Sequence, residues 1–321
     1  MHTAYVKTDG RVEVYDTIDP GWLDDDSQAV VWVDIIEPDE QDARMMREVL
    51  SLHELAIEDA LGEVHSPKVE SYPGFLYLIL HGIDHTASDH VFATHDVDFF
   101  LGRNFLVTVH DGTFRSLKRV AEICPRSDHL LAEGPAALMH RIVDLMVDNY
   151  LPEVDELDDW IDEIEKQVFD SPAALHVRDI LELKRDVVSL RRVTIPQRDV
   201  VGRLARREFS EIDMSVAFRF RDVYDHLVRI ADEAMVFSDR ITSLLDAHLS
   251  ATSNRLNEVV KVLTIITTVF GPLTVLSGLF GMNVHLPLFP GDDTHQFWWV
   301  LGMMAVAVGS MLYFFRRRGW I

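Results

Sequence analysis

The sequence is poor in cysteine and in basic residues, and both shortages limit what the protein can be. Cys124 is the one cysteine in 321 residues, so no disulfide can form within the chain and a cysteine redox pair is excluded. We expect it to be a small buried apolar residue. Lysine and arginine total 30 against 53 aspartates and glutamates, a formal net charge of -23. Because phosphate backbones select basic surfaces, nucleic acid is not expected as a partner, and cations are the more natural ligands.

Charge is missing altogether from two stretches near the C-terminus. Residues 262–291 and 294–315 contain no Asp, Glu, Lys or Arg. Each includes about 19 largely apolar residues, and a helix of that length reaches ~28 Å, enough to cross a bilayer. We predict two transmembrane helices, at about 260–281 and 297–316, with a pair of long buried core helices as the alternative.

The flanks of these helices predict their orientation. Arg255 and Lys261 precede the first helix and 316–318, three arginines, follow the second, whereas the connection carries only Asp292 and Asp293. Basic flanks stay cytoplasmic. The N-terminal residues also lack the basic start and apolar core of a signal peptide. We therefore expect a multi-pass protein of the cell (inner) membrane, with both termini in the cytoplasm.

Residues 1–135 mix strand-like and helix-like segments and predict a cytoplasmic α/β domain. Branched and aromatic residues bounded by Gly, Pro or Asp are typical of strands. Acidic residues leading an amphipathic run are typical of helices. The predicted strands are 29–35, 74–83, 90–100 and 104–110, and the predicted helices are 37–51 and 113–123. Their pattern leaves the sheet type open.

From Pro135 the pattern changes to long helices, and 136–258 is predicted to be a helical stalk. The segment 151–166 holds eight acids and one lysine, whereas 181–208 carries eight bases. We interpret them as an antiparallel hairpin with intramolecular ion pairs, rather than reading the basic helix as a nucleic-acid surface. The next segment, 213–280, has no glycine or proline before Gly271, which favours one helix from stalk to membrane; two stacked helices are the alternative.

The first membrane helix carries small and polar residues along one side. At ~100° per residue, they fall within one arc. Its members are Val260, Thr264, Thr267, Gly271, Thr274, Gly278 and Met282, with Asn257 beside them. Such a stripe suits either a water-filled path or the close packing of membrane helices. Two helices cannot enclose a path for water, so conduction would require several copies.

The stretch GMN, Gly281 to Asn283, ends this helix and resembles the signature of the CorA family of divalent-cation channels, within the 2-TM-GxN superfamily. The resemblance extends to 257–283, to FRDVYDH at 220–226, to 65–80 and to the C-terminal RRRGW. It implies an α+β membrane protein: a cytoplasmic α/β domain, a stalk helix that continues into the first of two membrane helices within 259–321, and a homopentameric funnel surrounded by membrane lipid.

The resemblance also implies roles for individual residues. Gly281, Met282 and Asn283 would form the selectivity filter, where neutral carbonyl oxygens hold the water shell of Mg²⁺ without removing it. The other residues implied or read as pore-lining are Asn257, Val260, Leu263, Thr264, Thr267, Gly271, Thr274 and Gly278. Regulatory Mg²⁺ would bind Asp222 and Asp246 together with Asp84 or Asp89. The family commonly has methionine at the positions of Gly271 and Val260, so the constriction here is expected to be wider or elsewhere.

The resemblance implies influx of Mg²⁺, with Co²⁺ as a second candidate ion, through a channel that is driven by the membrane potential and closed by cytoplasmic Mg²⁺. No G-x-x-x-x-G-K-[ST] loop points to an ATP site. Residues 81–98 hold four histidines and four aspartates, which suits either a solvated connection or a site for softer ions. The alternatives are a Zn²⁺ transporter on the same scaffold and a non-conducting membrane-anchored metal sensor. A metal-dependent hydrolase lacks a nucleophile motif, so no enzyme is expected.

Overall fold

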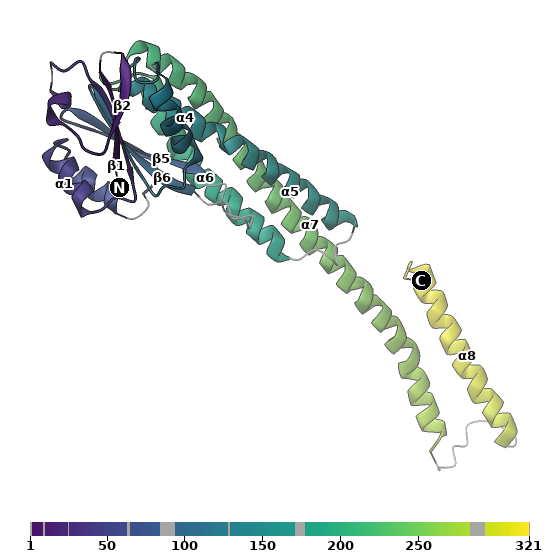
Figure 1. The fold of residues 1–321 in the computed structure, drawn as a ribbon. Helices are drawn as coiled ribbons and strands as arrows, with labels where there is room; N and C mark the ends of the chain where they lie inside the picture. The colour runs from purple at the N-terminus through teal and green to yellow at the C-terminus, as the bar shows by residue number, and fades with distance from the viewer. Residues whose placement is uncertain are drawn as a thin grey trace. The chain divides into compact units, whose positions relative to one another are not determined.

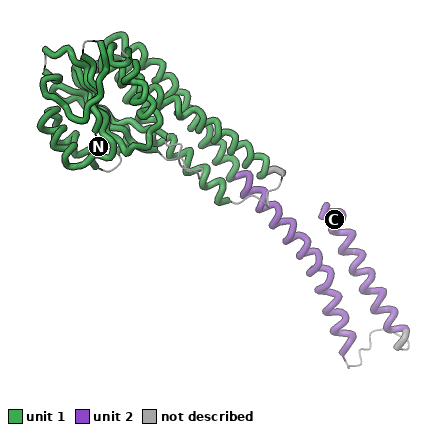
Figure 2. The backbone as a smooth tube through the Cα atoms, in the orientation of Figure 1, with its two compact units in different colours: residues 1–245 green, residues 246–321 purple. Residues whose placement is uncertain are grey.

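The computed structural model describes residues 2–8, 10–24, 26–62, 65–83, 94–127, 129–170, 177–282 and 293–320. They belong to two compact units, residues 1–245 and residues 246–321 (Figure 2). Unit 1 contains a sheet with short helices, followed by long helices (Figure 1). One helix, α7 (Met214–Phe280), belongs to both units. The sequence therefore forms the predicted single helix from stalk to membrane segment, not two stacked helices.

Unit 1 begins with a seven-stranded mixed sheet in the order β2-β1-β3-β7-β6-β5-β4. β3 and β7 pair in parallel, whereas the other neighbours pair antiparallel. The bounds are β1 His2–Thr8, β2 Arg11–Tyr15, β3 Val30–Ile36, β4 Lys68–Tyr72, β5 Phe75–Ile83, β6 Thr94–Gly102 and β7 Phe105–His110. The four predicted strands are confirmed, and residues 90–93 of the third lie outside the described residues. The sequence analysis missed the strand pair at the N-terminus and the edge strand β4.

Helices cover both faces of this sheet, as an α/β domain requires. On one face Met46 and Ile57 pack into a core with Tyr77 and Phe100. On the other face α4 packs against β3, β5, β6 and β7, and Cys124 is fully buried, as expected. The helix bounds are α1 Glu40–Glu48, α2 Glu54–Leu61, α3 Arg115–Ile123 and α4 Pro135–Asp148, with 3-10 turns η1 Pro20–Leu23 and η2 Cys124–Arg126. α2 was not predicted.

The long helices of unit 1 pack through a repeat with alternating spacings of three and four residues. These helices are α5 (Tyr150–Asp170), α6 (Val177–Ala205) and the first part of α7. In α7 the buried positions that follow this repeat are Val216, Phe220, Val223, Leu227, Ile230, Ala234, Phe237, Ile241 and Leu244. A 3.5-residue repeat keeps one apolar seam facing its neighbours along a coiled coil. The seam of unit 1 thus gives the stalk its rigidity.

The acidic helix α5 forms the intramolecular ion pairs that were predicted, with a partner that was not. α5 packs against α6, as in the expected hairpin. However, Arg240 of α7 holds three carboxylates of α5. Its guanidinium nitrogens lie 2.6 Å from Asp158, 2.5 Å from Asp162 and 3.1 Å from Glu165. The spacing of these acids, at i, i+4 and i+7, places them on one side of α5, where one arginine can reach all three.

Candidate ion pathway

Unit 2 contains the apolar end of α7 and the helix α8 (Asp293–Arg317). Both helices are long and apolar enough to cross a membrane, and none of the most apolar window of either is buried in the structure. Charged residues lie only beyond these windows among the described residues, at Arg255, Glu258 and Lys261 and at the end of α8. Apolar helices left so exposed need lipid or further protein around them.

The two sides of the α7 membrane segment differ in what covers them. Half-buried residues recur along one side, and the first of them contacts the residues after α8: Lys261, Ile265, Val269, Leu273, Leu276 and Phe280. The predicted pore-lining set consists of Asn257, Val260, Leu263, Thr264, Thr267, Gly271, Thr274 and Gly278, and we call it the pore face. All of it is exposed except Thr264, which is half-buried. At ~100° per residue the centres of the two sides lie ~180° apart. Within one chain the pore face is therefore uncovered, apart from Thr264, which lies at its edge and lines a cavity against α8.

The threonine hydroxyl groups on the pore face donate their hydrogens within α7 and can act only as acceptors toward other groups. Thr264 donates to the carbonyl of Val260 at 2.7 Å, and Thr267 donates to that of Leu263 at 2.9 Å. Thr274 makes the same bond, 2.8 Å long, one turn back along the helix. Because each hydrogen is used by the helix, the oxygen offers only lone pairs outward. Waters bound to a cation point their hydrogens away from it, so acceptors are the groups that such a hydrated ion meets best.

The end of α7 explains why a glycine stands at position 281. The amide of Gly281 donates to the carbonyl of Ser277 at 2.9 Å and closes the last turn. A Cβ added at Gly281 would lie 2.8 Å from that same carbonyl oxygen, too close for any real side chain, whereas Gly271 and Gly278 have open space. Met282 is 58% exposed. Asn283, the third residue of the predicted filter, lies outside the described residues.

The predicted regulatory residues do not form a metal site within one chain. Asp222 and Asp246 are both exposed on α7, and Asp84 and Asp89 lie outside the described residues. Asp222 lies near Asp144 of α4, where burial, and then the charges of neighbouring aspartates, raise the pKa of the Asp144 carboxyl against the opposing effect of His140. No group of three or more His, Cys, Asp or Glu side chains in the described ranges is arranged to hold an ion.

The described part of the 81–98 cluster takes up separate structural contacts. His81 is buried, and its amide donates to Gln197 at 2.7 Å while its ring contacts the carbonyl of His65 at 2.5 Å. Burial lowers the pKa of His81, which favours the neutral ring. His95 pairs with Asp111, whereas Asp98 accepts a hydrogen bond from a buried tyrosine. Residues 84–93 lie outside the described residues, and the side chains on either side of them do not converge on one ion.

Comparison with known proteins decides the family. The family described as CorA-like Mg²⁺ transporter protein matches residues 27–317. This chain belongs to that family. A relative named cobalt/magnesium transport protein CorA, from Thermotoga maritima, is 31% identical over 299 residues, covering 92% of this chain and 85% of the relative.

Solved structures of the CorA-like family share the whole fold. The complete structure of the CorA magnesium transporter from Methanocaldococcus jannaschii has a TM-score of 0.83 at 23% identity, covering 100% of this chain and 99% of that one. The full-length CmaX protein has a TM-score of 0.79 at 21% identity, covering 98% and 96%. The α/β domain, the long helix and the second C-terminal helix are thus the architecture of solved proteins.

In this CorA-like chain, a contact that was not predicted joins the two membrane helices at their basic end. The ammonium of Lys261 donates to the carbonyl of Gly319 at 3.3 Å, a contact between α7 and the residues after α8. The signal was present in the sequence: a glycine directly after a basic last turn, followed by an aromatic residue, is typical of a helix C-cap.

Proposed function

We propose that this chain is one subunit of a membrane channel for divalent cations, in which several copies of α7 turn their pore faces to a common axis. The observation that carries the proposal is that the pore face, with the acceptor oxygens of Thr267 and Thr274, is exposed within one chain, whereas the half-buried residues of this segment lie on the opposite side of α7. A closed ring is the expected symmetry of such an assembly. The resemblance to CorA channels favours five copies.

The transported ion in this proposal is Mg²⁺ with its water shell. Support comes from the family and from the relative named as a cobalt/magnesium transport protein. The filter would be the ring of Gly281, Met282 and Asn283, whose neutral oxygens bind the hydrated ion weakly enough to release it. Because Mg²⁺ loses water reluctantly, a path lined by acceptors suits the ion better than one that replaces its ligands.

Both termini would lie in the cytoplasm, since basic residues gather at the end of the helix pair that holds Arg255, Lys261 and the arginines after α8. Entry then follows the membrane potential. A divalent ion crossing 100 mV gains ~4.6 kcal/mol, twice the value for one charge. The chain needs no chemical step to drive such uptake.

Cytoplasmic Mg²⁺ would close the pore by binding between subunits. The exposed Asp222 on the stalk and a carboxylate of a neighbouring α/β domain, Asp84 or Asp89, would share the ion, with Asp246 nearer the membrane. Closure requires the ion to bind the closed form better than the open one.

Flux through the pore face tests this proposal. The full chain is reconstituted into vesicles that enclose a Mg²⁺-sensitive dye, and the initial rate of Mg²⁺ entry is measured under an imposed potential. Thr267→Val keeps the shape of the side chain and removes its acceptor oxygen from every copy. We expect entry to fall at least tenfold, since one lost hydrogen bond of ~1 kcal/mol is worth about fivefold and the loss repeats around the ring.

The matched control is Thr242→Val, because Thr242 makes the same hydroxyl bond to the carbonyl of Ser238, 2.9 Å long, on the exposed stalk part of α7. Its entry rate should equal that of the unmodified chain. Asn283→Ala, at the predicted filter, should abolish entry. Equal rates for Thr267→Val, Asn283→Ala and the unmodified chain would contradict a pore on this side of α7.

A further inference from the structure

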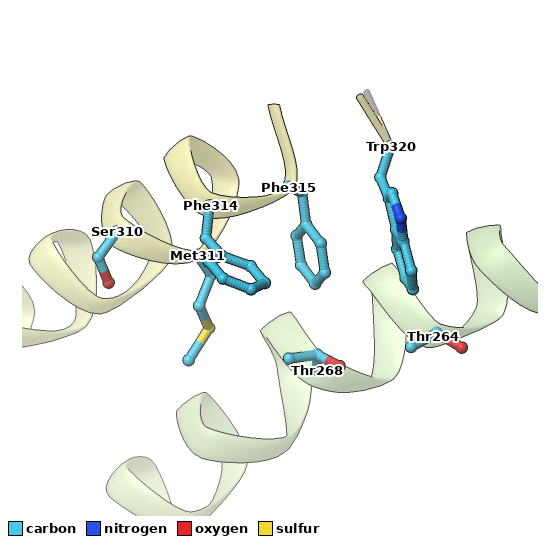
Figure 3. A pocket seen from close by; sticks show the side chains of 7 residues that line it. All are labelled: Thr264, Thr268, Ser310, Met311, Phe314, Phe315 and Trp320. Atoms are coloured by element: carbon cyan, nitrogen blue, oxygen red, sulfur yellow. The ribbon is translucent and has the colours of Figure 1, made fainter. Parts of the chain in front are cut away.

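A cavity of about 410 Å³ lies within unit 2, between the membrane segment of α7 and the basic end of α8. Figure 3 shows its lining side chains, which come from both helices and from the residues that follow α8. They are Thr264, Thr268, Ser310, Met311, Phe314, Phe315 and Trp320. Most of this lining is apolar, so the cavity suits an apolar ligand or part of one.

The C-terminus builds one wall of this cavity through a glycine turn. Gly319 has a φ of 69°, and its amide donates to the carbonyl of Arg316 at 3.1 Å. The amide of Trp320 donates to the carbonyl of Phe315 at 2.9 Å. These two bonds form a Schellman cap, which reverses the chain at the end of a helix. The indole of Trp320 then stacks on the ring of Phe315, with ring centres 5.6 Å apart.

The same turn is attached to α7. The carbonyl oxygen of Gly319 accepts a hydrogen bond from the Lys261 ammonium at 3.3 Å. Phe315 is only 5% exposed, a low value in a unit whose apolar side chains are mostly open. Because these side chains are already held in place, little conformational entropy would be lost in ordering them when a ligand binds.

Two of the three hydroxyl groups that line the cavity, those of Ser310 and Thr264, already donate to an acceptor in their own helix. The hydroxyl of Ser310 donates to the carbonyl of Ala307 at 2.8 Å, and that of Thr264 donates within α7. Because both hydrogens are used by the helices, neither hydroxyl leaves an unmade donor against an apolar group. A hydrocarbon chain can therefore occupy the cavity without stranding these donors.

The rim of the cavity is strongly basic. Lys261, Arg316, Arg317 and Arg318 lie at this end of the helix pair, directly beyond the charge-free membrane segments. The guanidinium of Arg318 lies 5.3 Å from the ring centre of Phe314, which lines the cavity. An apolar cavity beside a cluster of cations matches an amphipathic molecule with a hydrocarbon tail and an anionic head. Basic pockets between membrane helices on the cytoplasmic side bind anionic lipid head groups in this way.

We propose that this cavity binds an anionic phospholipid of the cytoplasmic leaflet, with one acyl chain between α7 and α8 and the phosphate at the arginines that end α8. The inference rests on the membrane orientation of the proposed function and goes beyond ion transport. A bound lipid would connect the outer helix to the pore helix at the level where Lys261 already contacts the C-terminal turn.

Native mass spectrometry of the full chain tests the lipid site. The protein is reconstituted in vesicles of equimolar phosphatidylcholine and phosphatidylglycerol, extracted in mild detergent, and weighed with its retained lipids. We expect phosphatidylglycerol to be retained about fivefold more than phosphatidylcholine, and Arg318→Gln to remove most of this preference. Ser310→Leu fills the cavity and should abolish retention of both lipids. Ala305→Leu places the same side chain at an exposed position of α8 and should leave retention unchanged.

Three outcomes would overturn the lipid site. Equal retention of the two lipids by the unmodified chain would contradict binding of the phosphate by the arginines. If Ser310→Leu retains as much lipid as the unmodified chain, the acyl chain does not lie in the cavity. A changed number of chains in Ser310→Leu, with the lipid count unaltered, would show that another copy of the protein fills the space. Lipid counts do not depend on conduction, so Mg²⁺ entry measured in the same vesicles reports separately on the proposed channel.

Discussion

Replacing Gly281 by alanine adds one methyl group at the end of α7 and tests whether the geometry of this last turn sets the proposed filter. The added Cβ would lie 2.8 Å from the carbonyl oxygen of Ser277, which also accepts the Gly281 amide at 2.9 Å. Ordinary contacts of a Cβ begin at 3.4 Å. The last turn must therefore shift by about 0.6 Å, at a cost of ~1–3 kcal/mol for such an overpacked position.

This cost predicts the size of the effect on transport. A shift in the turn would displace Met282 and the predicted filter residue Asn283. The native arrangement of these residues, which we call the native mouth, then competes with a displaced one. At 1.4 kcal/mol per factor of ten, a cost of this size lowers the population of the native mouth by about 10- to 100-fold. We expect the initial rate of Mg²⁺ entry into vesicles to fall by a similar factor, with the helix content measured by circular dichroism unchanged.

Gly302→Ala is the matched control, because a Cβ at Gly302 of α8 has no neighbouring heavy atom within 4 Å. Alanine is also the better helix former, by ~1 kcal/mol. This variant should keep the entry rate of the unmodified chain. The steric reasoning fails if Gly281→Ala conducts normally, or if both alanine variants lose flux to the same extent.

Three further predictions concern unit 1. Burial raises the pKa of Asp98 to about 7, so the folded chain binds this proton more tightly than the unfolded chain, and stability falls as pH rises from about 4 to 7. Asp98→Asn should therefore raise the free energy of unfolding at pH 8 by on the order of 4 kcal/mol, seen as a higher melting temperature, and leave both nearly unchanged at pH 4. Arg240→Gln should destabilise the stalk by ~1–2 kcal/mol in denaturant titrations at low salt and by less at high salt, whereas Arg229→Gln, which breaks a single exposed pair, should cost under ~0.5 kcal/mol. Asp222→Ala should keep Mg²⁺ entry open at millimolar internal Mg²⁺, whereas Asp232→Ala should close normally, and closure of both would refute the gating role.

The candidate ion came from the resemblance to the CorA family. Sequence alone predicted the membrane helices, the continuous helix and the residues that share one side of it, for a common physical reason. Each depends on local chemistry along the chain: the absence of charge from 262–280, the absence of glycine and proline before Gly271, and residue spacing on a single helix. Helix continuity needs only the neighbours within one turn, and crossing a membrane needs only length and low polarity. The strands between 29 and 110 were visible for a related reason, since branched and aromatic runs bounded by turn residues favour extended chain.

Tertiary structure decided which partner each element meets. The acids of α5 could pair with many basic residues. Arg240 lies more than 70 residues away from them in the sequence, so no local pattern pointed to it as their partner. The mixed sheet depends on the pairing of β3 with β7, which no local pattern encodes.

The stripe on α7 shows the division most clearly. The sequence left two meanings open, close helix packing or a water path, because small and polar residues serve both. Within one chain most of the stripe is exposed and the half-buried residues lie on the other side of α7, so the stripe is free to face other copies, as the proposed channel requires. Spacing within one helix fixes which residues share a side, and only the packing of a second helix fixes what that side faces.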